Sequence, residues 1–278
     1  KIIPQSGTTL TVGDSGDTVT FTSGANLSVD GTVKLDGNYP TATNNVALGN
    51  AALDDGSLSG NQNTAVGSAS LSANTSGANN TAMGCGALVL NTTGADNTAI
   101  GSLSLDANTT GNYNTAVGHL SLTANTTADD NTAIGRSSMC KNTTGASNTA
   151  VGRLALFNNT TASNNTAVGK SALCSNTTGS QNIAIGHSAL IANTTAENNT
   201  AVGFRALCST TTGFDNAAVG RNALASNTAS SNTAVGAFSL NSNTTGTKNT
   251  SVGKCTLASN TTGNCNTALG VDALTTNS

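Results

Sequence analysis

The chain has 278 residues, of which 8% are charged and 3% aromatic, with no Trp, two Pro and two Met. This composition excludes a globular core built from large side chains, so small residues in a regular arrangement must replace it. The formal net charge of −3 argues against a nucleic-acid-binding protein, which needs a broad basic surface. No apolar run approaches the roughly 18 residues of a membrane-spanning helix, so we expect no membrane insertion.

The first segment, residues 1–40, alternates apolar and polar residues between Gly-Asp-Ser turns, as at Leu10 and Val12. Such alternation is typical of short β-strands. We expect residues 1–40 to form an N-terminal β-strand connector or cap, because terminal segments of solenoids protect the open end of the stack. Residues 41–278 differ in pattern and are predicted to form a separate repeat domain.

The repeat domain is marked by fourteen glycines, each closing a stretch similar to Asn-Thr-Ala-Val-Gly. We call them the coil glycines: Gly49, Gly67, Gly84, Gly101, Gly118, Gly135, Gly152, Gly169, Gly186, Gly203, Gly220, Gly236, Gly253 and Gly270. Their spacing is 17 residues except for a first step of 18 and a step of 16 before Gly236. Gly and Asn-Thr in every copy weaken any helix, whereas this period suits one coil with two short strands and two turns. We therefore predict an all-β fold, a parallel β-solenoid of β-roll type with fourteen coils.

An asparagine stands four residues before every coil glycine, and we call this set the ladder asparagines. Equivalent residues in neighbouring coils would stack at about 4.8 Å, so the amides could pass hydrogen bonds along the axis. Neither Asp nor Ser combines the same donor and acceptor, which explains the absence of substitutes. The predicted ladder includes Asn63, Asn80, Asn97, Asn114, Asn131, Asn148 and Asn165.

Two apolar positions are predicted to fill the inner core of each coil, with Ala and Ser between them keeping the coil narrow. One directly precedes the coil glycine, as in Val66, Ile100 and Val117, and the other lies four residues after it, as in Leu71, Leu88, Leu105 and Leu122. Two such side chains cannot offset the backbone entropy lost in ordering a whole coil. We therefore expect coils to stack and one face of the stack to be buried against other subunits of a homo-oligomer.

Several stretches carry a family resemblance, among them NTAVGHLSLTANTT, NTAIGSLSLDANTTG and NTAVGKSALCSNTTG. They resemble the repeats of phage tail-fibre proteins and of bacterial proteins with tail-fibre domains. They are also similar to the head repeats of trimeric autotransporter adhesins, whose left-handed parallel β-rolls pack three to an axis.

This resemblance implies a homotrimeric, non-enzymatic fibre, structural and adhesive, carried on a virion or located outside the cell. It implies a phage tail fibre or spike that positions a host-receptor-binding tip, with a cell-surface glycan or protein receptor as partner. The alternative is a bacterial surface adhesin head, or a subunit of a self-assembling extracellular filament.

A basic stripe directly follows the coil glycines, formed by His119, Arg136, Arg153, Lys170, His187, Arg221 and Lys254. Acidic residues gather five or six places before the glycines, as Asp96, Asp129, Asp130, Glu197 and Asp215. One interpretation is that these charges are solvated or form intersubunit ion pairs that set the register between rolls. The other is that the basic stripe captures anionic surface glycans.

The six cysteines and two histidines give no sign of a metal, cofactor or catalytic site. There is no C-x-x-C pair, and His119 and His187 lie four coils apart. Cys140, Cys174 and Cys208 occupy one position in alternate coils, beyond disulfide reach within a chain, so we expect buried small hydrophobic residues there. Cys255 and Cys265 remain candidates for a local disulfide.

Repeated threonine also raises an ice-binding interpretation. The two threonines of each Asn-Thr-Thr corner are adjacent, however, and adjacent side chains point to opposite faces of a strand. A flat threonine array is therefore not expected at the corners.

Overall fold

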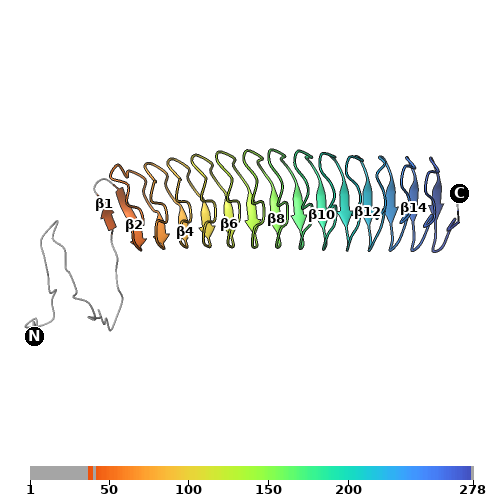
Figure 1. Cartoon of the computed structure of the whole chain (residues 1–278), viewed down its shortest axis with the longest axis horizontal. Helices are drawn as coiled ribbons and strands as arrows, with labels where there is room; N and C mark the ends of the chain where they lie inside the picture. The colour runs from red at the N-terminus through yellow and green to blue at the C-terminus, as the bar shows by residue number, and fades with distance from the viewer. Residues whose placement is uncertain (1–36, 40–41, 277–278) are drawn as a thin grey trace, which may run out of the picture. The chain divides into compact units, whose positions relative to one another are not determined.

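The computed structural model of the protein describes residues 37–39 and 42–276, and within them the fold is a β-solenoid of about 13 turns (Figure 1). The described residues contain fifteen strands and no helix, and the strands form one sheet in sequence order. Figure 1 shows the coils following one another along a single rod. The predicted all-β, parallel solenoid is confirmed, whereas the predicted connector at 1–40 lies outside the described residues apart from 37–39.

The strands are short. Their bounds are β1 Gly37–Tyr39, β2 Ala42–Leu48, β3 Thr64–Val66, β4 Thr81–Met83, β5 Thr98–Ile100, β6 Thr115–Val117, β7 Thr132–Ile134, β8 Thr149–Val151, β9 Thr166–Val168, β10 Ile183–Ile185, β11 Thr200–Val202, β12 Ala217–Val219, β13 Thr233–Val235, β14 Thr250–Val252 and β15 Thr267–Leu269. Strand β1 pairs with β2 antiparallel, and β2 to β15 pair in parallel.

Equivalent residues lie directly beside one another in neighbouring coils. The register between β6 and β7 pairs Ala116 with Ala133 and Val117 with Ile134. The same register holds where the spacing of the coil glycines is irregular, since Ala218 pairs with Ala234 across the 16-residue step. A change in coil length is therefore absorbed outside the strand.

Each coil contains one strand, so the prediction of two strands per coil was wrong. The remainder is a series of turns, yet it is hydrogen-bonded from coil to coil: Leu122 N–H donates to the Ser138 carbonyl over 3.0 Å. The turns arise because several residues adopt positive φ, including Leu120 at 55° and Leu122 at 53°. Leucine rarely adopts this left-handed conformation, so the sequence did not reveal it.

The inner core consists of leucine and alanine. Leu122 and Ala116 have no exposed surface, and the same holds for most of their counterparts. The prediction that the aliphatic residue before the coil glycine fills the core was wrong: Ile100 is 39% exposed, and Val66 and Val117 are only partly buried. Side chains alternate along a strand, so a central alanine that faces inward sends both of its neighbours outward.

The ladder asparagines stand in a single file and bond to the backbone. The Asn131 N–H donates to Asn114 Oδ1 over 3.0 Å, and Asn131 Nδ2 donates to the Gly145 carbonyl over 2.9 Å. This double use explains why Asp, which lacks the amide donor, does not replace Asn.

A second file of asparagines lies seven residues after the coil glycines, and we call these the corner asparagines. Asn125 Nδ2 donates to Asn108 Oδ1 over 3.0 Å and also to the Ala128 carbonyl. The regular chain of amide-to-amide bonds therefore runs through the corner asparagines. The sequence analysis placed these residues at the corners but predicted no ladder there.

The coil glycines are required by both conformation and space. Gly118 has a φ of 131°, and a Cβ atom there would lie 2.8 Å from the carbonyl carbon of Gly135. Any side chain would therefore push neighbouring coils apart.

Candidate functional site

The outer face of the sheet carries two columns of side chains that are exposed or partly exposed. We call the residues before the coil glycines the outer aliphatic column: Leu48, Val66, Met83, Ile100, Val117, Ile134, Val151, Val168, Ile185, Val202, Val219, Val235, Val252 and Leu269. Met83 is 43% exposed and Ile185 is 40% exposed. A parallel sheet is usually covered on both faces, so an aliphatic column that is open to solvent in the single chain is unusual for such a sheet.

A column of threonines runs beside it on the same face, because the first and third residues of each Thr-Ala-Val strand point the same way. Thr115 of β6 pairs with Thr132 of β7, and the column continues through most strands, with Val46, Ile183 and Ala217 as exceptions. A threonine array is therefore present on the strands, although none is expected at the corners. The sequence analysis missed this array.

The predicted basic stripe lies along one edge of this face, and we call it the basic edge. All seven of its predicted residues are exposed. Arg136, Arg153 and Lys170 occupy consecutive coils, so their backbone positions repeat at about 4.8 Å. Like charges repel one another, so an anionic partner would stabilise this row of cations.

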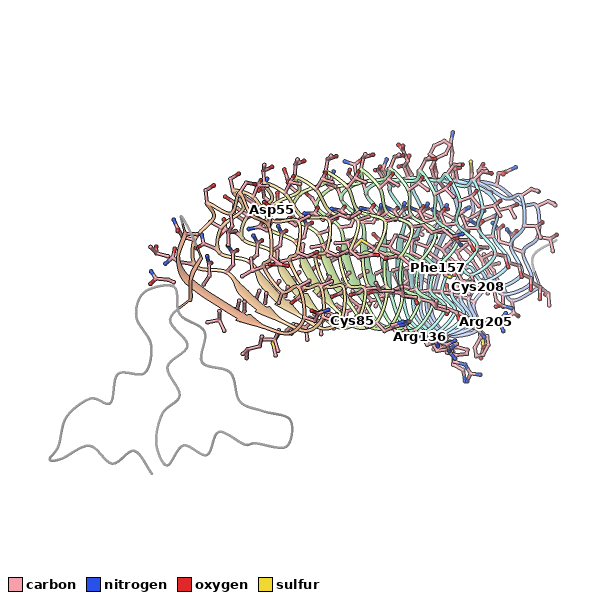
Figure 2. All side chains as sticks on the ribbon, turned by 60° about the vertical axis from the view of Figure 1, so that its left-hand side comes forward. Asp55, Cys85, Arg136, Phe157, Arg205 and Cys208 are labelled. Carbon is pink, nitrogen blue, oxygen red and sulfur yellow. The ribbon has the colours of Figure 1, made fainter. Side chains whose placement is uncertain are left out.

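Aromatic rings extend the basic edge. His187 stacks on Phe204 with ring centroids 5.5 Å apart, and the Arg221 guanidinium lies 5.2 Å from the centre of the Phe238 ring. Such contacts hold the flat groups in place through cation–π and stacking interactions. Arg205 adds a further exposed cation, and Figure 2 shows Arg136 and Arg205 at the same border of the solenoid. The sequence analysis missed Arg205 because it stands one residue beyond the repeating basic position.

The acidic residues lie before the strand rather than after it, so the two charged sets are separated by the strand itself. Within the described part of the chain, no residue of the basic edge forms an ion pair. Asp129 instead accepts a hydrogen bond from the Asn112 N–H over 2.6 Å. The structure of the single chain thus leaves open whether these charges are solvated, form ion pairs between subunits or bind anionic glycans.

All six cysteines are free thiols, so the candidate disulfide between Cys255 and Cys265 is not formed. Cys208 is buried, as expected for a small hydrophobic residue. Cys140 and Cys174 are partly buried, and this burial raises the pKa of both thiols. Among residues 37–39 and 42–276, no cluster of three or more potential metal-binding side chains occurs, and no helix could span a membrane.

These features define the class of the protein: a parallel β-solenoid repeat protein with one exposed sheet face and a basic edge. Searches with protein-family models, against curated proteins and against solved structures found no match to the chain. Functional inference therefore rests on the repeat and its surfaces.

Proposed function

We propose that the chain is the rod segment of a homotrimeric extracellular fibre, a phage tail fibre or spike that holds a host-receptor-binding tip away from the particle. The observation that carries this proposal is the outer aliphatic column, which remains aliphatic in every coil although it is exposed in the single chain. An exposed column that stays apolar over fourteen strands is expected only where a partner covers it.

The size of the outer face suits a subunit interface. Fourteen strands at about 4.8 Å extend roughly 60 Å, and a three-residue strand spans roughly 10 Å. The resulting area of about 600 Å² approaches the roughly 800 Å² that each partner contributes to a standard stable interface. Three left-handed rolls around one axis, as the family resemblance implies, would bury three such faces and leave the corners in solvent.

The stack itself suits a spacer rather than an enzyme. Neighbouring coils are bonded through strand pairing, turn hydrogen bonds and the ladder asparagines, and most of them also through the corner asparagines, so bending requires many bonds to be broken together. We propose no catalytic role and no cofactor.

The second candidate is a bacterial surface adhesin head or a subunit of an extracellular filament. The basic edge favours an adhesive surface, because its cations have no carboxylate partners among the described residues and would attract anionic cell-surface glycans. A membrane-anchoring segment encoded beside this chain would support the adhesin, and a fibre-assembly chaperone domain would support the tail fibre.

Disruption of the outer face tests the trimer. We expect the double variant Ile134→Lys and Val151→Lys to sediment as a folded monomer in analytical ultracentrifugation while the unaltered chain sediments as a trimer. Burying two unpaired cations costs several kcal/mol in each subunit. Lysine at the exposed corner residues Thr127 and Thr144 is the matched control and should leave the trimer intact.

Two results would count against the trimer: a monomeric unaltered chain, or a trimer in the Ile134→Lys, Val151→Lys variant. If the chain is a monomer, the outward threonine and aliphatic columns make ice binding the next candidate. Thermal hysteresis of the purified monomer would then support ice binding.

A further inference from the structure

The repeat is interrupted in the interior of the solenoid at one corner, between Gly203 and Gly236. Thr210 stands where the other coils from Gly67 to Gly253 have a corner asparagine. In the next coil the corner is one residue shorter, because Asn227 is followed by Thr-Ala-Ser-Ser before Asn232, where most coils have five residues. Two departures from the repeat therefore adjoin.

The first departure leaves a polar atom without a partner. In regular coils, each corner asparagine donates to the Oδ1 atom of the one before it. Thr210 has no amide and donates instead to the Asn227 carbonyl over 2.7 Å. As a result, the buried Asn193 Oδ1 has no hydrogen-bond partner within the described residues. An unsatisfied buried oxygen lowers stability, so this break has no structural benefit.

The second departure removes the residue that would stack on Thr212. The Phe214 N–H keeps the bond to the next coil that regular coils make at this position, as from Ala146 to Ser163, and donates to the Ser230 hydroxyl over 3.0 Å. The Phe214 side chain is 52% exposed. A pocket of about 210 Å³ lies here, lined by Thr195, Ala196, Glu197, Asn198, Thr212 and Phe214. Departures from a repeat that reduce stability are expected at functional sites.

The lining of this pocket has the chemistry of a sugar site. The exposed ring of Phe214 offers an apolar face, and Glu197, Asn198 and two threonines offer hydrogen-bonding groups around it. A pyranose ring has the matching character, with C–H groups on one face and hydroxyls around its rim. Among the residues that the structure describes, no lysine or arginine lines the pocket, and the Glu197 carboxylate would repel an anionic sugar.

We propose that this pocket binds one neutral hexose or hexosamine residue of a glycan, with the sugar ring stacked on Phe214 and its hydroxyls bonded to Glu197 and Asn198. The volume is enough for one monosaccharide ring and not for a longer segment. This site is separate from the basic edge, because its residues precede the strand whereas the basic residues follow it.

Saturation-transfer NMR and calorimetry with the methyl glycosides of glucose, galactose and N-acetylglucosamine test the proposal, with methyl glucuronide as the anionic contrast. We expect at least one neutral glycoside to bind, with transfer from aromatic protons, and the glucuronide not to bind. Phe214→Ala should weaken binding at least tenfold, or about 1.4 kcal/mol. Tyr113→Ala is the matched control, because Tyr113 is an exposed aromatic residue at a regular corner, and it should leave binding unchanged.

A second variant tests the pocket independently, in case Phe214→Ala does not fold. Inserting one threonine after Thr228 restores the 17-residue coil and should abolish binding while the circular dichroism spectrum is retained. The proposal is overturned if none of the three neutral glycosides binds, or if Phe214→Ala and Tyr113→Ala have equal effects. Loss of sugar binding in a chain that remains trimeric would reject this pocket alone and leave the fibre proposal standing.

Discussion

The inner and outer sides of each coil obey different constraints. Inside, Leu122 and Ala116 have no exposed surface, and Gly118 has no space for a Cβ atom, so geometry alone explains why these positions hardly vary along the chain. Outside, the residue after the coil glycine varies among Asn, Ser, Cys, His, Arg, Lys, Phe, Ala and Val. The outer aliphatic column is exposed or partly exposed and yet does not vary in character, which the proposed subunit interface would explain.

Truncation of an inner leucine should have the largest effect on stability. Leu122→Ala removes a fully buried side chain and is expected to lower the free energy of unfolding by about 2–5 kcal/mol. Leu120→Ala is the matched control, because Leu120 has the same left-handed backbone but is only partly buried. Both substitutions are made in the monomeric Ile134→Lys, Val151→Lys background, so that chemical denaturation measures the stability of the folded chain without a contribution from subunit assembly. Equal losses in the two variants would contradict the assigned core.

Replacement of a ladder asparagine should have the next largest effect. In Asn114→Asp, the carboxylate can still accept the Asn131 N–H but loses the donor that bonds the Ala128 carbonyl over 2.8 Å. We expect a loss of about 1–3 kcal/mol, since a buried carbonyl is left unsatisfied. The same substitution at the exposed Asn164 should change stability by less than about 0.5 kcal/mol in the same denaturation assay.

Restoring the missing corner asparagine should increase the stability of the fold. Thr210→Asn supplies the amide that Asn193 Oδ1 lacks and is expected to raise the free energy of unfolding by about 0.5–1.5 kcal/mol. Asn176→Thr, the reverse change in a regular coil, should cause a loss of similar size. If neither variant changes the unfolding midpoint, the hydrogen bonds between corner asparagines do not stabilise the fold.

The rates at which the cysteine thiols react compare buried with exposed positions and require no substitution. Cys85 and Cys265 are exposed and should react with a maleimide first. Cys140 and Cys174 should react more slowly, because burial raises the pKa of their thiols and lowers the reactive thiolate fraction. Cys208 is buried and should be slowest, and mass spectrometry after timed labelling measures this order. Rapid labelling of Cys208 in the folded chain would contradict its placement.

The solenoid was predictable from the sequence because the coil glycines and ladder asparagines recur at fixed spacing, and stacking is the fold that gives every copy the same environment. The orientation of the strand was not correctly predicted: the apolar character of Val117 suggested the core, whereas the smaller Ala116 occupies it. Hydrophobicity was misleading here because the narrow interior has room only for a small side chain opposite leucine.

The candidate surfaces were predictable in part. The basic edge followed from position alone, because every residue after a coil glycine shares one environment. The pocket beside Phe214 was not predicted, although both of its signals, Thr210 and the 16-residue step, are visible in the sequence. To predict the pocket from these two signals, one must know which coils are neighbours and that Asn193 loses a hydrogen bond. The spacing of the repeats does not reveal either.

The central claim is that the outer face is a subunit interface, and the mass of the particle in solution tests it most directly. Light scattering on the unaltered chain at micromolar concentration should give three times the chain mass of 27.1 kDa. A particle of one chain mass, stable across dilution, would show that the aliphatic column remains in solvent and would contradict the account.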